Sequence, residues 1–79
     1  MTNSEKYDGA FMRVFSIEQG KLPGLAYQEI QEWDSIGHLN LMAELESVFD
    51  ISMETDDIVD FSSYEKGKEI LSGKYNVAF

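Results

Sequence analysis

The sequence predicts an all-α fold, a small four-helix bundle of three main helices and one short helix with a long first loop. Two observations lead to this prediction: apolar residues recur at helical spacing in several segments, and no segment sustains the alternation typical of a strand. The 79 residues are 43% hydrophobic, which supplies one core but not two. We therefore expect a single domain over residues 1–79.

The first helix is expected over residues 5–18. Its apolar side chains recur every three or four residues and comprise Tyr7, Ala10, Phe11, Val14 and Phe15. Thr2 and Glu5 have the spacing of a capping box, in which each side chain accepts a hydrogen bond from the other residue's backbone N–H. Gly20 is expected to follow the C-terminus of this helix.

The segment 19–33 is predicted to be a long loop. It contains Gly20, Pro23 and Gly24 and shows no sustained periodicity. Loops of this length are uncommon in compact domains, so we expect apolar side chains to fix it across the helices. These side chains are Leu22, Leu25, Ile30 and Trp33. A fixed loop that leads into one helix indicates that the start of that helix matters for function.

The second main helix has the clearest apolar stripe, formed by Leu41, Met42, Leu45, Val48 and Phe49. His38 extends this stripe by one turn, which favours a partly buried structural histidine over a general base. The opposite face carries Ile36, Asn40, Ala43 and Ser47, bordered by Glu44, Glu46 and Asp50. This face is either an ordinary solvated surface or a docking surface for a partner protein, and the pattern leaves both interpretations open.

A short helix is expected to start at Thr55, and the last helix to cover residues 63–72. Both starts carry an N-cap residue followed by acids, namely Thr55 with Asp56 and Asp57, and Ser62 with Glu65. Gly67 lies inside the last helix, where it lowers helix propensity, and this indicates close packing of another element. Gly73 is expected to end the helix.

The charge of the chain is unevenly distributed. The formal net charge is −9, and no Lys or Arg lies between Lys21 and Lys66, where most of the acidic residues fall. Such a surface repels nucleic acid and anionic membranes and attracts basic proteins, although an acidic surface that only confers solubility has the same composition. No apolar run is long enough for a membrane span and no signal peptide is evident, so we expect a cytoplasmic monomer.

Conventional active sites are hard to assemble from these residues. The chain has no cysteine and a single histidine, so neither a thiol nucleophile nor a zinc site is expected. A segment similar to a calcium loop begins at Asp50, but Thr55 occupies its glycine position and Phe61 its closing glutamate position. We expect no specific metal site and no enzyme activity, and loose binding of Mg²⁺ or Ca²⁺ by the carboxylates is a separate hypothesis.

Ser35 is the strongest candidate for chemistry. It lies within Trp33-Asp34-Ser35-Ile36-Gly37-His38-Leu39, where the long loop meets the second main helix, and it would occupy the N-cap or the first turn. Free backbone N–H groups and the helix dipole make this position favourable for a phosphate ester. A plain N-cap serine is the alternative interpretation.

The segment Asp34-Ser35-Ile36, followed by an acid-edged helix, resembles the acyl carrier proteins of the phosphopantetheine-binding carrier protein family. The resemblance covers nearly the whole chain through its size, helix order, long first loop, short third helix and acidic middle. It implies that a phosphopantetheinyl transferase attaches 4′-phosphopantetheine from coenzyme A to Ser35, with Asp34 and Ile36 contacting the transferase. It also implies a partner-recognition surface that comprises Ile36, Asn40, Ala43, Glu44, Glu46 and Asp57.

The resemblance implies a carrier of acyl thioesters in fatty-acid or specialised acyl or polyketide-type biosynthesis. Its partners would be acyl-transferring, condensing or ligating enzymes with basic docking surfaces. Gly37 and Asn40 replace acids common in fatty-acid carriers, and Trp33 and His38 are more typical of specialised pathways. The family often shelters the acyl chain among its helices, and the aromatic residues here are expected to leave less room. The alternative hypothesis is an acidic helical interaction module, an adaptor or inhibitor without a prosthetic group.

Overall fold

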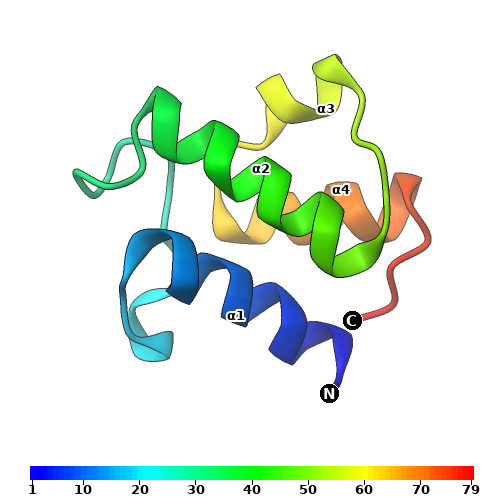
Figure 1. Ribbon diagram of the computed structural model, residues 1–79, viewed down its shortest axis with the longest axis horizontal. Helices are drawn as coiled ribbons and strands as arrows, with labels where there is room; N and C mark the ends of the chain where they lie inside the picture. Colours follow the sequence, from blue (N-terminus) through cyan, green and yellow to red (C-terminus); the bar gives the residue numbers. More distant parts are fainter.

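The computed structural model describes residues 1–79 and confirms the all-α prediction, because it contains helices and no strand. The elements are α1 (Asn3–Phe15), the 3₁₀ turn η1 (Gln19–Lys21), α2 (Ser35–Phe49), α3 (Thr55–Asp60) and α4 (Tyr64–Lys74) (Figure 1). The three main helices are α1, α2 and α4, and α3 is the short one. None of the helices is long and apolar enough to cross a membrane.

The first helix, α1, begins at Asn3, two residues before the predicted start, and it ends earlier than predicted. Thr2 is its N-cap residue, and the capping box is complete: the Thr2 hydroxyl accepts from the Glu5 N–H at 3.1 Å, and the Glu5 carboxylate accepts from the Thr2 N–H at 2.9 Å. The helix ends at Phe15 because Ser16 adopts a left-handed conformation with φ 54°. The predicted end at residue 18 is therefore wrong, and Gly20 lies within η1.

The core enclosed by α1, α2 and α4 has 16 buried residues, and six of them are aromatic. Phe11 and Phe15 of α1 contact Trp33 of the loop, with ring centroids 5.5 Å and 5.3 Å apart. Tyr7 packs on Phe11, and its hydroxyl donates a hydrogen bond to the Tyr64 carbonyl at 2.7 Å. Each buried ring removes a large apolar area from water, so these rings supply much of the stability of the fold.

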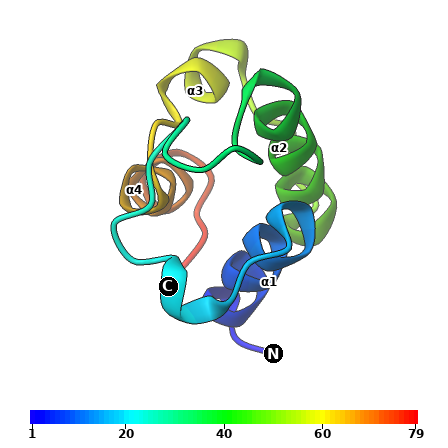
Figure 2. The same ribbon diagram turned by 90° about the vertical axis from the view of Figure 1, so that its left-hand side faces the viewer.

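The long loop is fixed across the molecule, as the sequence predicts. Its buried side chains are Leu22, Leu25 and Trp33, and Ile30 is partly buried against the core. The Tyr27 N–H donates to the Ser62 carbonyl, and this backbone hydrogen bond joins the loop to the segment that precedes α4. Figure 2 shows the loop crossing the end of the bundle at which α2 and α4 begin.

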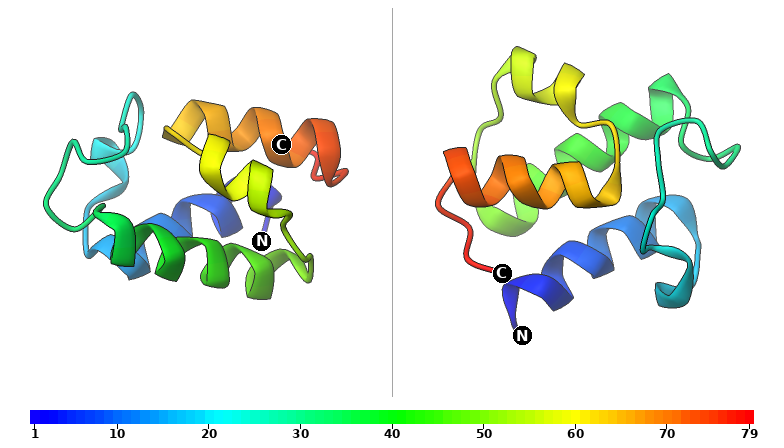
Figure 3. Two further views of the ribbon diagram at one scale, coloured as in Figure 1. Left: turned by 90° about the horizontal axis from the view of Figure 1, so that it is seen from above. Right: turned by 180° about the vertical axis from the view of Figure 1, so that it is seen from behind.

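The short helix α3 and the last helix α4 each have their N-cap one residue away from the predicted position. Glu54 occupies the N-cap of α3 without a side-chain hydrogen bond, and Ser63 rather than Ser62 caps α4, its hydroxyl accepting a first-turn N–H at 3.0 Å. Gly73 does not end α4, which continues to Lys74. Figures 1 and 3 show α3 lying beside α2 and α4, so it covers one edge of the bundle.

The surroundings of Gly67 confirm the prediction that another element packs closely against the last helix. A Cβ atom at this position would lie 2.1 Å from Cζ of Phe61 and 2.2 Å from the Tyr7 hydroxyl. Only a residue without a side chain therefore allows both rings to pack against α4.

Candidate functional site

The start of α2 presents Ser35 to solvent. Asp34 is the N-cap residue, and its Oδ1 accepts a hydrogen bond from the Gly37 N–H at 2.8 Å. Ser35 is the first helical residue, so it occupies the first turn rather than the N-cap. Its side chain is exposed and its hydroxyl forms no hydrogen bond within the chain, and the backbone N–H groups of Ser35 and Ile36 are also free of partners in the chain.

Gly37 has a steric role that the sequence analysis did not identify. A Cβ atom at Gly37 would lie 1.9 Å from the carbonyl oxygen of Glu32 and 3.3 Å from the Phe15 ring. The loop therefore passes directly against the first turn of α2, and an acidic side chain cannot occupy this position without moving the backbone.

His38 is a structural residue beside Ser35, as its place on the apolar stripe predicts. Its Nδ1 accepts from the Trp33 indole N–H at 2.9 Å, and its Nε2 lies 2.7 Å from the Ile58 carbonyl oxygen. An indole nitrogen only donates and a carbonyl only accepts, so the ring is the neutral tautomer with its proton on Nε2. Both ring nitrogens are thus already used, and His38 does not serve Ser35 as a base.

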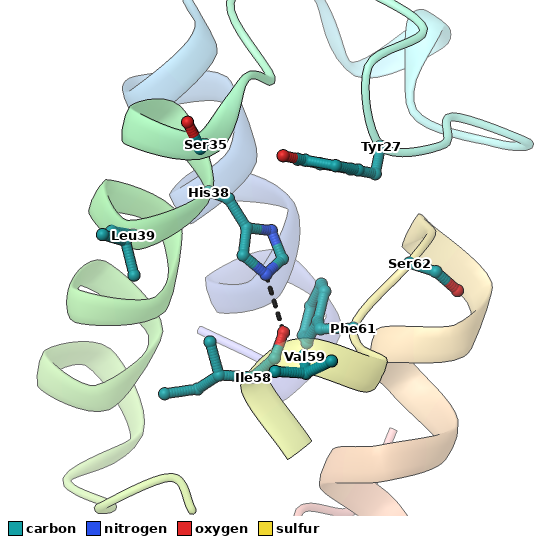
Figure 4. Close-up of a pocket in the computed structure, with 8 residues that line it drawn as sticks. All are labelled: Tyr27, Ser35, His38, Leu39, Ile58, Val59, Phe61 and Ser62. Atoms are coloured by element: carbon teal, nitrogen blue, oxygen red, sulfur yellow. Dashed lines mark hydrogen bonds between the residues drawn. The ribbon is translucent and has the colours of Figure 1, made fainter. Parts of the chain in front are cut away.

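A pocket opens next to Ser35, between α2, α3 and the two segments that precede α2 and α4 (Figure 4). Its volume is about 400 Å³. The lining residues are Tyr27, Ser35, His38, Leu39, Ile58, Val59, Phe61 and Ser62. Most of the lining is apolar, so the pocket offers a water-poor surface directly beside the free hydroxyl.

The sequence analysis did not identify this pocket. Leu39 and Val59, at its rim, are 61% and 74% exposed, and both lie outside the buried stripes of their helices. These two apolar residues outside the buried stripes were the available signal for a pocket. Nothing in the sequence shows that α2 and α3 bring them to the same pocket. Tyr27, His38 and Phe61 line the pocket, and the expectation that aromatic residues leave less room for an acyl chain stays a prediction.

Part of the predicted partner-recognition surface is exposed along α2. Ile36 is 71% exposed, and Asn40 and Ala43 are also exposed on the same helix. Together with Leu39, these residues form an exposed surface of α2 that begins one residue after Ser35.

The two glutamates of this predicted surface form contacts within the chain. Glu44 accepts a hydrogen bond from Nε of Arg13 at 2.9 Å, which ties α2 to α1. Glu46 accepts from the Met53 N–H at 2.8 Å, which fixes the connection between α2 and α3. Both side chains are only partly exposed, so they carry structural roles in addition to any role in docking.

The assignment of Asp57 to the docking surface is wrong. Asp57 is only 2% exposed. Its Oδ1 accepts a hydrogen bond from Nζ of Lys74 at 2.7 Å, and its Oδ2 accepts one from the Tyr75 hydroxyl at 2.6 Å. These two hydrogen bonds hold the pKa of the Asp57 carboxyl below its usual range, and the one from Lys74 has the larger effect. Asp57 faces the end of α4 instead of solvent because these two donors lie there.

The arrangement around Ser35 contains a nucleophile without its own catalytic machinery. A hydroxyl, free first-turn amides and an apolar pocket lie together, but no base is placed to activate the hydroxyl. No group of three or more acidic or histidine side chains is arranged to hold a metal ion. Comparison of the chain with protein-family models, curated proteins and solved structures gave no significant match.

Proposed function

We propose that this chain is an acyl carrier protein in which the Ser35 hydroxyl is esterified with 4′-phosphopantetheine. The observation that carries the proposal is the exposed, unbonded hydroxyl of Ser35 in the first turn of α2, directly after the N-cap Asp34 and at the edge of the pocket. A phosphate on this hydroxyl would lie near the free amides of Ser35 and Ile36 and the positive end of the helix dipole.

The composition of the chain supports a carried prosthetic group. Thioester chemistry requires a thiol, and the chain has no cysteine, so the thiol must be supplied by the attached arm. Ser35 has no neighbouring base, so a separate transferase would activate it. The Ser35 oxygen would form a bond to phosphorus of coenzyme A, the pyrophosphate bond would break, and the hydroxyl proton and the adenosine bisphosphate would leave.

The exposed part of α2 supports sequential docking of partner enzymes. A contact surface of mixed polarity lies next to the proposed attachment site and comprises Ile36, Leu39, Asn40 and Ala43. The net charge of −9 attracts enzymes with basic docking surfaces and makes the encounter rate fall as salt rises. These partners would be the transferase and acyl-transferring, condensing or ligating enzymes.

Intact-mass measurement tests the attachment. The purified chain, incubated with coenzyme A, Mg²⁺ and a broad-specificity phosphopantetheinyl transferase, should gain the mass of one phosphopantetheine. Ser35→Ala should gain nothing, whereas Ser47→Ala, which removes another exposed serine of α2, should be modified like the parent chain. An unmodified parent chain would refute the proposal and leave the acidic interaction module as the better hypothesis.

The role of Asp34 can be separated from its contribution to stability. Asp34→Ala removes the N-cap of α2 and should lower the free energy of unfolding by about 1 kcal/mol. Asp34→Asn keeps an oxygen that can accept the Gly37 N–H but removes the negative charge, so stability should change little. If Asp34 contacts the transferase through its charge, Asp34→Asn should still lower the modification rate, measured by mass over time. An unchanged rate would restrict Asp34 to capping.

A further inference from the structure

His38 closes the inner side of the pocket beside Ser35. Its imidazole extends from α2 toward α3, where Nε2–H donates to the Ile58 carbonyl at 2.7 Å, and this hydrogen bond is visible across the pocket in Figure 4. The Trp33 N–H fixes the other ring nitrogen. Held at both nitrogens, the ring cannot swing aside unless one of the two hydrogen bonds breaks.

The space behind His38 is already filled. The Trp33 indole lies edge to edge with the imidazole, nearly parallel to it, with centroids 6.2 Å apart and an interplanar angle of 15°, and Phe15 stacks on Trp33 at 5.3 Å. Phe61, which also lines the pocket, is 1% exposed. The structure contains no second pocket, so a chain that enters past the exposed rim meets rings and has no continuing path into the core.

We propose that His38 is the specificity-determining residue of this pocket and restricts its ligand to a short or medium-length acyl group, so that long saturated chains do not fit. The acyl group enters between Leu39 and Val59, its first methylenes contact the apolar lining, and the imidazole stops it. The additional methylenes of a long saturated chain remain in solvent. This inference rests on the proposed attachment of the arm at Ser35, because the arm brings the acyl group to the pocket.

A chain-length series on the parent protein tests the depth of the pocket. The transferase loads the chain from acetyl-, butyryl-, hexanoyl-, dodecanoyl- and hexadecanoyl-coenzyme A, intact mass confirms each product, and Tm is compared with that of the unacylated holo form. Tm should rise on the order of 3 °C for each methylene that is buried, and it should not rise between the dodecanoyl and hexadecanoyl forms. A rise that continues to hexadecanoyl, or no rise with any acyl group, would overturn the inference.

Variants at His38 test whether this residue sets the limit. His38→Ala should lower Tm in every form, yet the acyl-dependent rise should extend to longer chains because the barrier between α2 and α3 is gone. His38→Gln, whose amide can accept from Trp33 and donate to Ile58, should keep the parent limit. Thr2→Ala, which weakens the remote cap of α1, should lower Tm and also keep the parent limit.

The outcomes distinguish the two proposals. Failure of the transferase to load the parent chain removes the proposed function and this inference together. Successful loading, with the same length limit in His38→Ala as in the parent, removes only the role of His38. If His38→Ala does not fold, the parent series and His38→Gln still decide whether the pocket has the limited depth that the structure indicates.

Discussion

The helices α1 and α3 are held to the rest of the molecule by different kinds of contact. The buried residues of α1 include three rings, those of Tyr7, Phe11 and Phe15, whereas the only buried residue of α3 is Asp57. Hydrogen bonds hold α3, between Asp57 and the end of α4 and between the Ile58 carbonyl and α2, together with the partly buried Ile58 side chain, which packs against the core. Ring burial scales with apolar area, while the hydrogen bonds to Asp57 depend on the ionisation of its carboxyl group.

This difference indicates that α1 and α3 belong to parts of the fold with different local stability. An element with little buried apolar area opens at a lower free energy than the core. Because Ile58 and Val59 of α3 line the pocket, opening of α3 changes the pocket while the contacts between α1 and the other rings remain. The candidate site therefore lies on the side of the molecule that is expected to open at the lower free energy.

The largest effect among these tests is expected where rings pack against α4. Gly67→Ala places a methyl group into space occupied by Phe61 and Tyr7, and we expect it to lower the free energy of unfolding by about 1–3 kcal/mol. Gly73→Ala, in the same helix but with no atom within 4 Å of the added Cβ, should raise stability by up to about 1 kcal/mol. Urea unfolding monitored by circular dichroism measures the free energy of unfolding of both variants. Equal changes in the two variants would show that helix propensity, and not packing, determines their stability.

A smaller global effect is expected from Asp57→Asn, and it should be concentrated in α3. The variant weakens the contacts with Lys74 and Tyr75, so amide hydrogen exchange should accelerate more in α3 than in α1. Uniform acceleration in both helices would contradict the proposed difference in local stability.

The contribution of Asp57 should also depend on pH. Because hydrogen bonds from Lys74 and Tyr75 lower its pKa in the folded state, its stabilising effect is complete above the ordinary aspartate pKa of about 3.9. The effect is lost as pH falls through the lower folded value. The difference in Tm between the parent chain and Asp57→Asn should therefore narrow below pH 4, and a difference independent of pH would exclude this cause.

Local sequence patterns were sufficient for the helices and for the position of Ser35. The apolar stripe of α2 and the loop before it place Ser35 at a helix start without knowledge of any distant contact. Helix ends were less certain, because the end of α1 depends on the left-handed backbone of Ser16, which its residue type does not dictate. Within the candidate site, the sequence therefore predicted that Ser35 and its immediate neighbours lie at the start of α2.

The pocket and the orientation of the carboxylates required tertiary information. Tyr27, His38 and the pair Val59 and Phe61 come from three different segments, and no periodicity in one segment predicts their meeting. Asp57 was assigned to the docking surface as part of what the resemblance to acyl carrier proteins implies. Its burial depends on Lys74 and Tyr75, which lie in α4 and directly after it. Contacts between residues distant in sequence thus explain the error.

The position of Trp33 gives the molecule a built-in optical probe. It is the only tryptophan of the chain, it is fully buried, and its indole N–H is bonded to the imidazole that lines the pocket. Indole emission responds to the polarity and hydrogen bonding of its surroundings. Fluorescence of the unlabelled protein should therefore report both global unfolding and any displacement of His38 when the pocket is filled.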